Sequence, residues 1–231
     1  MKSFRLLLLA LMLASASSVA QTADLFTWSQ GNVLADSKYM LLGDNNDTPM
    51  TGDEKLNIYK TYNVYSPDGK SKYVVRLNGT RPAMTEDGMY DGFSITNSSG
   101  QELLLRFGND PLWAVRNLTT AYGDKANFIQ VPLANESFAL IFSGCLFDAC
   151  DEAGEMIIVV VNKDKATVVY DAPAFAYKYT APPNFSIEFV DNIAGLLDDY
   201  GKSTVTAAKL ASRTKYKIWR EGDMLKYKSW K

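Results

Sequence analysis

Pairs of strand-forming segments, each pair joined by a turn sequence, constrain the fold of this chain more than any other feature. Residues 56–66 (LNIYKTYNVYS) alternate between apolar and polar side chains, and residues 72–77 (KYVVRL) follow after the turn Pro67-Asp68-Gly69. The Asp-Gly pair adopts the backbone geometry that a tight hairpin turn requires. The same signature recurs within residues 93–107 and 215–230.

Two further segments are continuously apolar. Residues 138–142 (FALIF) and 156–161 (MIIVVV) carry no polar side chain. A short apolar run without alternation is typical of a strand whose two faces are both buried. Residues 162–165 predict a polar turn, after which residues 166–170 (ATVVY) pair back. We therefore expect central strands in this part of the chain.

Helix signals are fewer. Asp110-Pro111 predicts the start of a short helix over residues 112–118, because Pro is favoured in the first helical turn. Residues 185–200 carry apolar side chains at helical spacing, and Gly201 is a plausible end for that helix. Residues 204–212 predict another short helix.

Together, these elements predict an α+β fold. It consists mainly of an antiparallel sheet built from hairpins, with a few short helices packed on it. Residues 80–91 and 172–183 are expected to form loops at the boundaries between regions, the second because of its three prolines.

The N-terminus predicts export. Lys2 and Arg5 precede the apolar run 6–13, and Ser18-Val19-Ala20 supplies the small residues of a cleavage site. We expect residues 1–20 to be a signal peptide and the working protein to be periplasmic or secreted. The apolar run is shorter than the roughly 20 residues that a membrane span needs. The remainder divides into a strand-rich region, 21–109, and an α+β region, 110–231, which form either two units or a single domain.

Composition limits the possible activities. The chain has 24 basic and 26 acidic residues, a formal charge of −2, so it lacks the basic excess that predicts nucleic-acid binding. It contains no His, which removes Ser-His-Asp and Cys-His catalysis and every His-ligated metal site. Its acidic clusters match no calcium-loop template, so we expect no metal and no cofactor. An enzyme is disfavoured, although carboxylate chemistry remains open.

The two cysteines, Cys145 and Cys150, lie between the two apolar strands. Because an exported protein meets an oxidising compartment, we expect them to form a disulfide. The ring would present Leu146, Phe147 and Asp148 as a preorganised knob, and preorganisation lowers the entropic cost of binding. The alternative is a stable turn in which Phe147 packs back against the sheet.

The strand-flanked pattern Ser143-x-Cys145-x4-Cys150, together with Pro111-Leu112-Trp113-Ala114-Val115 upstream, resembles the Ivy family of periplasmic inhibitors of vertebrate (C-type) lysozyme. The resemblance covers roughly residues 110–171. It implies an antiparallel sheet with helices and a protruding disulfide loop that enters the lysozyme cleft. The family typically carries His inside the loop, where this chain has Asp148, so a carboxylate would face the catalytic carboxylates of the enzyme.

Three functions follow as hypotheses. The first is an exported binding or inhibitor protein that presents Leu146, Phe147 and Asp148 to a protein partner, with a lysozyme or another wall-cleaving enzyme as the candidate. The second is an envelope-accessory or structural protein without an active site. The third is a glycan hydrolase that works with carboxylates alone and needs two of them in one cleft.

Overall fold

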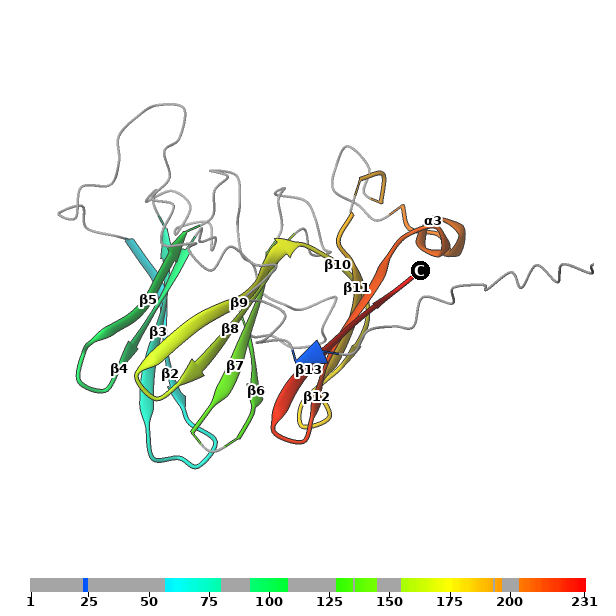
Figure 1. The fold of residues 1–231 in the computed structure, drawn as a ribbon. Coiled ribbons are helices and arrows are strands. Elements are labelled where there is room, and N and C mark those ends of the chain that lie inside the picture. Colours follow the sequence, from blue (N-terminus) through cyan, green and yellow to red (C-terminus); the bar gives the residue numbers. More distant parts are fainter. Residues whose placement is uncertain are drawn as a thin grey trace, which may run out of the picture.

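In a computed structural model, the described strands form three antiparallel sheets stacked as layers (Figure 1). Apart from one two-residue strand near the N-terminus, each sheet is built from consecutive segments of the sequence. The described residues are 23–24, 57–79, 92–107, 128–134, 136–144, 155–192, 194–196 and 204–231. The predicted signal peptide 1–20, the predicted loop 80–91 and the predicted helix 112–118 lie outside them.

The first sheet contains β2 (Asn57–Tyr65), β3 (Lys72–Gly79), β4 (Gly92–Asn97) and β5 (Glu102–Phe107), in chain order. Each strand pairs with the next, so the sheet is a simple up-and-down meander. Gly69 has a φ of 73° in the β2–β3 turn, a conformation that residues with a side chain rarely adopt. Both hairpins predicted in this part of the sequence are confirmed.

The central sheet contains β6 (Phe128–Pro132), β7 (Phe138–Gly144), β8 (Glu155–Asn162) and β9 (Lys165–Pro173). These strands also pair in chain order. In Figure 1 this sheet lies between the other two.

Burial on both faces explains the two apolar runs. In β7, Phe138, Leu140 and Phe142 pack in the core shared with the first sheet, and Ala139 and Ile141 pack in the core shared with the third. All five are fully buried. Because side chains of a strand alternate between faces, a strand between two cores needs an apolar residue at every position. The prediction of buried central strands is confirmed.

The third sheet contains β10 (Phe175–Thr180), β11 (Ser186–Val190), β12 (Lys215–Glu221) and β13 (Met224–Trp230). A two-residue strand, β1 (Ala23–Asp24), extends it beyond β13. The β12–β13 pairing confirms the hairpin predicted near the end of the chain.

The α+β prediction is wrong, because the described part of the chain is built almost entirely from antiparallel sheet. Its one α-helix is α3 (Ala207–Ala211), within the short helix predicted at 204–212. The Thr206 hydroxyl caps it by accepting a hydrogen bond from the Lys209 amide at 3.2 Å. Leu210 packs on the small cluster of Phe175 and Val190. Within the described residues, no helix is long and apolar enough to cross a membrane.

The helix predicted over residues 185–200 is wrong at its start, where β11 runs instead. Phe185, Ile187 and Phe189 are buried in the core between the central and third sheets. The error has a physical cause. A spacing of four residues matches one helical face, but it is also two periods of a strand, and Ile187 fits only the strand.

The loop predicted over residues 172–183 is also wrong, because β10 occupies its middle. Its prolines lie at strand boundaries: Pro173 ends β9, and Pro182 and Pro183 form the turn between β10 and β11. Proline is tolerated at such positions because no ladder hydrogen bond is lost there.

A buried ion pair ties the first sheet to the central sheet. Arg106 of β5 donates to both carboxylate oxygens of Asp171 in β9, at 2.7 to 2.9 Å. The two side chains are only 6% and 14% exposed. A planar guanidinium that meets a carboxylate in this way fixes geometry as well as charge, so the pair sets the alignment of two edge strands.

We predict that Asp171→Ala lowers the free energy of unfolding by about 3–5 kcal/mol, because it leaves the Arg106 charge buried without its carboxylate. Denaturant unfolding measures this. Arg106→Met combined with Asp171→Leu should recover most of the loss. Lys178→Ala, which breaks an exposed ion pair, is the control and should cost less than about 1 kcal/mol. Equal losses in Asp171→Ala and Lys178→Ala would contradict the prediction.

Candidate binding site

The two ends of the sheet stack differ in the length of their connections. At one end, which we call the turn end, short segments join the strands of each hairpin, and the longest of them is 66–71. At the opposite end, the loop end, Ala174 alone joins β9 to β10, and the other four connections are longer. These are residues 80–91, 108–127, 145–154 and 191–214.

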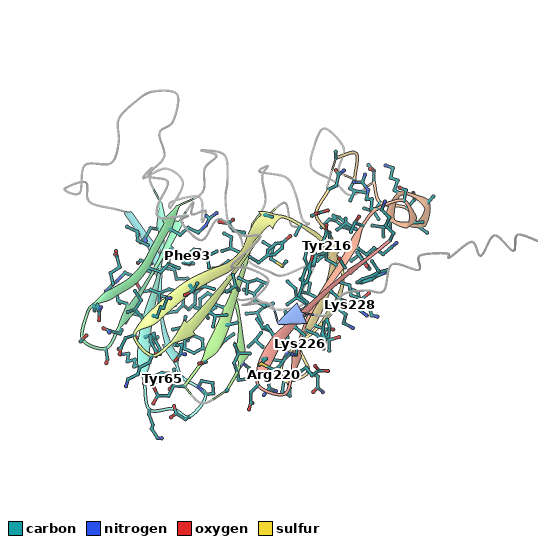
Figure 2. All side chains as sticks on the ribbon, in the orientation of Figure 1. Tyr65, Phe93, Tyr216, Arg220, Lys226 and Lys228 are labelled. Carbon is teal, nitrogen blue, oxygen red and sulfur yellow. The ribbon has the colours of Figure 1, made fainter. Side chains whose placement is uncertain are left out.

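Contacts between sheets show that the ends coincide from layer to layer. At the turn end, the Tyr73 hydroxyl donates to the Lys163 carbonyl at 3.0 Å, and the Ala134 amide donates to the Asp223 carbonyl at 3.1 Å. Nearer the loop end, the Phe93 ring stacks on the Phe142 ring with centroids 3.9 Å apart. Figure 2 labels Phe93 near the loop end. All four long connections therefore leave from one side of a rigid scaffold.

The connection that carries the cysteines is anchored on the two innermost strands of the described fold. β7 and β8 are paired up to Ser143↔Met156 and Gly144↔Glu155. Met156 is fully buried, as are the β7 side chains below it. The two ends of the segment 145–154 are thus held at a fixed separation by a strand pair whose side chains pack in both cores.

The residues predicted to bind a partner, Leu146, Phe147 and Asp148, lie outside the described residues, as do Cys145 and Cys150. Their predicted disulfide and binding role therefore stay predictions. The structure shows that the strands flanking them enter and leave at the loop end.

A second feature near the loop end is a carboxylate close to three tyrosines. Asp191, which follows β11, accepts a hydrogen bond from the Tyr216 hydroxyl. Its charge also acts on Tyr170 and Tyr227. Burial is the main cause that raises the pKa of all three phenols, and the charge of Asp191 raises each of them further. These hydroxyls are therefore neutral at physiological pH and do not act as bases.

Burial also raises the pKa of a fourth tyrosine, Tyr177. Desolvation, followed by the charge of Glu188, raises the pKa of its phenol to about 12. The Tyr177 hydroxyl has no hydrogen-bond partner among the described residues. A phenol in such surroundings resists ionisation, so it serves packing and not proton transfer.

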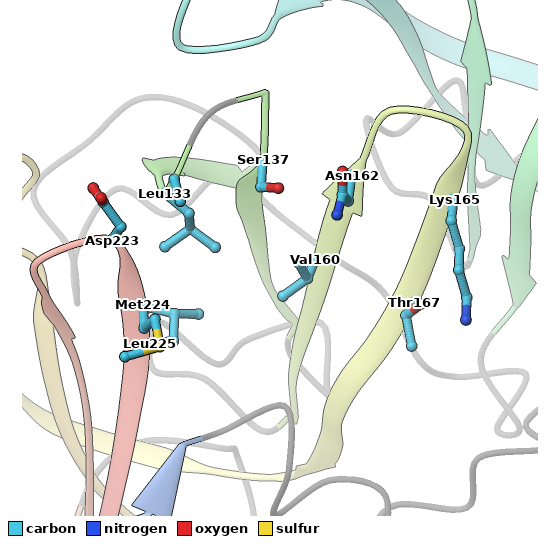
Figure 3. Close-up of a pocket in the computed structure, with 10 residues that line it drawn as sticks. Leu133, Ser137, Val160, Asn162, Lys165, Thr167, Asp223, Met224 and Leu225 are labelled. Carbon is cyan, nitrogen blue, oxygen red and sulfur yellow. The ribbon is translucent and has the colours of Figure 1, made fainter.

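A groove of about 300 Å³ opens at the turn end, between the central sheet and the β12–β13 hairpin (Figure 3). Leu133, Val160 and Leu225 form its apolar part. Lys165 and Asp223 are the charged residues of its lining, and they come from opposite sides of the groove. The remaining lining residues are Ala134, Ser137, Asn162, Thr167 and Met224.

The groove suits binding better than hydrolysis. Asp223 is the one acidic residue in its described lining, whereas a carboxylate-only glycosidase needs two carboxylates across a cleft. Within the described residues, no cluster of His, Cys, Asp and Glu is arranged to hold a metal ion. An apolar floor with hydrogen-bonding groups at its edge can accept one apolar side chain or a small amphipathic molecule.

Sequence reasoning missed both the groove and the Asp191 cluster. Each brings together residues from different sheets, and no spacing within the chain records which layers stack. The alternation of Tyr216 and Ile218 in β12 marks an inward face, but it does not identify Asp191 as a neighbour.

Comparison with protein-family models, with curated proteins and with solved structures finds no match for this chain.

The raised tyrosine pKa values predict alkaline instability. An unfolded tyrosine ionises near pH 10, whereas in the folded protein Tyr177 holds its proton until about pH 12. Stability from the neutral phenols is complete below about pH 10 and is lost as pH rises toward the raised pKa. Denaturant unfolding at a series of pH values should show this loss, and tyrosinate absorbance should appear together with unfolding.

The matched variants are Tyr177→Phe and Tyr65→Phe. Tyr177→Phe should flatten the alkaline decline, because it removes a group that must ionise on unfolding. Tyr65 is 51% exposed and serves as the control. An identical decline in the two variants would contradict the assignment to buried phenols.

Proposed function

We propose that this chain is an exported binding protein that engages a protein partner through its loop end. The observation that carries the proposal is the asymmetry of the connections: tight turns at one end of three stacked sheets, and four long segments at the other. Binding residues commonly reside on loops that a rigid scaffold positions.

The segment 145–154 is the strongest candidate among these connections. Its flanking strands are paired to their last residues, Gly144 and Glu155, in a sheet that is covered on both faces. A segment held by such strands loses less conformational entropy when a partner binds. Leu146 and Phe147 supply apolar area, and Asp148 supplies a charge. A lysozyme or another wall-cleaving enzyme is the partner class that we propose for this loop.

A lysis assay tests the proposal. The oxidised protein is titrated into C-type, G-type and invertebrate-type lysozymes acting on bacterial cells. We predict stoichiometric inhibition of at least one type, reduced more than tenfold in Phe147→Ala combined with Asp148→Ala, because the knob supplies the central contacts. Cys145→Ser with Cys150→Ser should weaken inhibition as well.

Glu221→Ala, at the turn end, is the matched control and should inhibit as the unmodified protein does. Far-ultraviolet circular dichroism and thermal unfolding confirm that each variant is folded. Absence of inhibition by folded, oxidised protein, or equal loss in Glu221→Ala, would refute the proposed loop.

A further inference from the structure

The outer face of the third sheet carries an unusual set of side chains. Ile218 and Tyr227 are direct cross-strand partners and face the central sheet, so the residues on either side of each face outward. We call these outward residues of β12 and β13 the Lys/Trp face. They are Lys215, Lys217, Trp219, Lys226, Lys228 and Trp230, all partly exposed.

The register arranges this face in three cross-strand rungs. Lys215 lies opposite Trp230, and Trp219 lies opposite Lys226. In the middle rung, Lys217 lies opposite Lys228. Two like charges directly opposite each other destabilise a sheet, so a further anion over this rung would stabilise it. Figure 2 labels Lys226 and Lys228 on this sheet, on the side of the molecule opposite the first sheet.

The acidic residues around the face do not balance its lysines. Glu188 of β11 is shared between two of them, with its Oε1 3.2 Å from the Lys178 Nζ and 3.4 Å from the Lys217 Nζ. Asp24 of β1 is placed beside Lys226 by the strand register. Among the described residues, the four lysines of the face and Lys178 of β10 thus meet two acidic residues, in a chain whose formal charge is −2. The positive charge is concentrated on one sheet face.

The two tryptophans lie close to the lysine ammonium groups of this face. The Lys228 Nζ is 5.9 Å from the centre of the Trp219 ring and 5.2 Å from that of Trp230. The Lys217 Nζ is 6.0 Å from the Trp219 ring. These distances lie within the range of cation–π attraction between an ammonium group and an indole ring. The face therefore combines aromatic rings with closely spaced positive charges.

We propose that the Lys/Trp face binds an acidic polysaccharide. Repeated carboxylate, sulfate or phosphate groups would pair with the lysines, and the apolar faces of sugar rings would stack on Trp219 and Trp230. A membrane surface fits less well. Insertion into a bilayer needs protruding apolar side chains, and the large apolar side chains most exposed in the described structure, Tyr65 and Met224, lie outside this set.

Binding of the full chain to heparin and to polygalacturonate tests the proposal, with dextran as the neutral polymer. We expect salt-sensitive binding to both acidic polymers and none to dextran. Lys217→Gln with Lys228→Gln should weaken binding at least tenfold and reduce the slope of log K against log salt by roughly two, since each lost lysine contact releases about one counterion fewer.

Lys70→Gln with Lys72→Gln is the matched control. It makes the same charge change next to the first sheet, at the other side of the stack, and should leave affinity unchanged. Trp219→Leu should weaken binding of both polysaccharides but not of inorganic polyphosphate, which has no sugar ring to stack.

Three outcomes would overturn the proposal: no binding by folded protein, equal weakening in the two double-lysine variants, or binding to phosphatidylglycerol vesicles without binding to either acidic polysaccharide. None of these measurements involves the loop end. The proposal therefore stands or falls independently of lysozyme inhibition.

Discussion

The fold depends on one constraint, which is that the central sheet cannot face water on either side. β7 and β8 place apolar side chains on both faces, in two separate cores. A sheet of this kind is stable only when another layer covers each face, as is usual for parallel sheets between helices. Here the covering layers are themselves antiparallel sheets, so three meanders form one stack. The outer layers each contribute one buried face, and the opposite face of the third sheet carries both the small cluster under α3 and the Lys/Trp face.

The same arrangement separates the possible functions in space. In a meander, connections alternate between the two ends of the sheet, so the length of every second connection can vary without disturbing a hairpin turn. In this chain the hairpin turns are short, and the long segments lie at the loop end. The groove lies at the turn end, and the Lys/Trp face lies on the outer side of the third sheet. A partner at one of these places leaves the other two accessible.

Local patterns predicted the hairpins, because turn residues such as Gly69 and alternating strands are encoded by neighbours in the sequence. The two-sided burial of β7 and β8 was also predictable, since it leaves an uninterrupted apolar run. The fold class was not. The run from Phe185 fits a helix and a strand equally until Ile187 is considered, and the prolines near β10 suggested a loop. The number of layers depends on contacts between residues far apart, as in Arg106 with Asp171, which no local pattern contains.

The sequence also pointed to a segment with two cysteines, and the structure shows that the strands flanking this segment are the innermost ones. The sequence alone could not reveal the groove or the Lys/Trp face. The groove residues meet only through the stacking of two sheets, and the residues of the Lys/Trp face become neighbours only through strand pairing. Lys217 and Lys228 are eleven positions apart, and only the β12–β13 pairing makes them neighbours.

Ala174 alone separates β9 from β10, so the chain passes from the central sheet into the third sheet without a loop. This residue is buried and is the direct chain link between the two layers. At the turn end, the same layers are joined by the hydrogen bond from the Ala134 amide to the Asp223 carbonyl. The two layers are therefore joined at both ends, by the chain at Ala174 and by this hydrogen bond. Ala134 and Asp223 both line the groove, so the hydrogen bond between them restricts how far its two walls can separate.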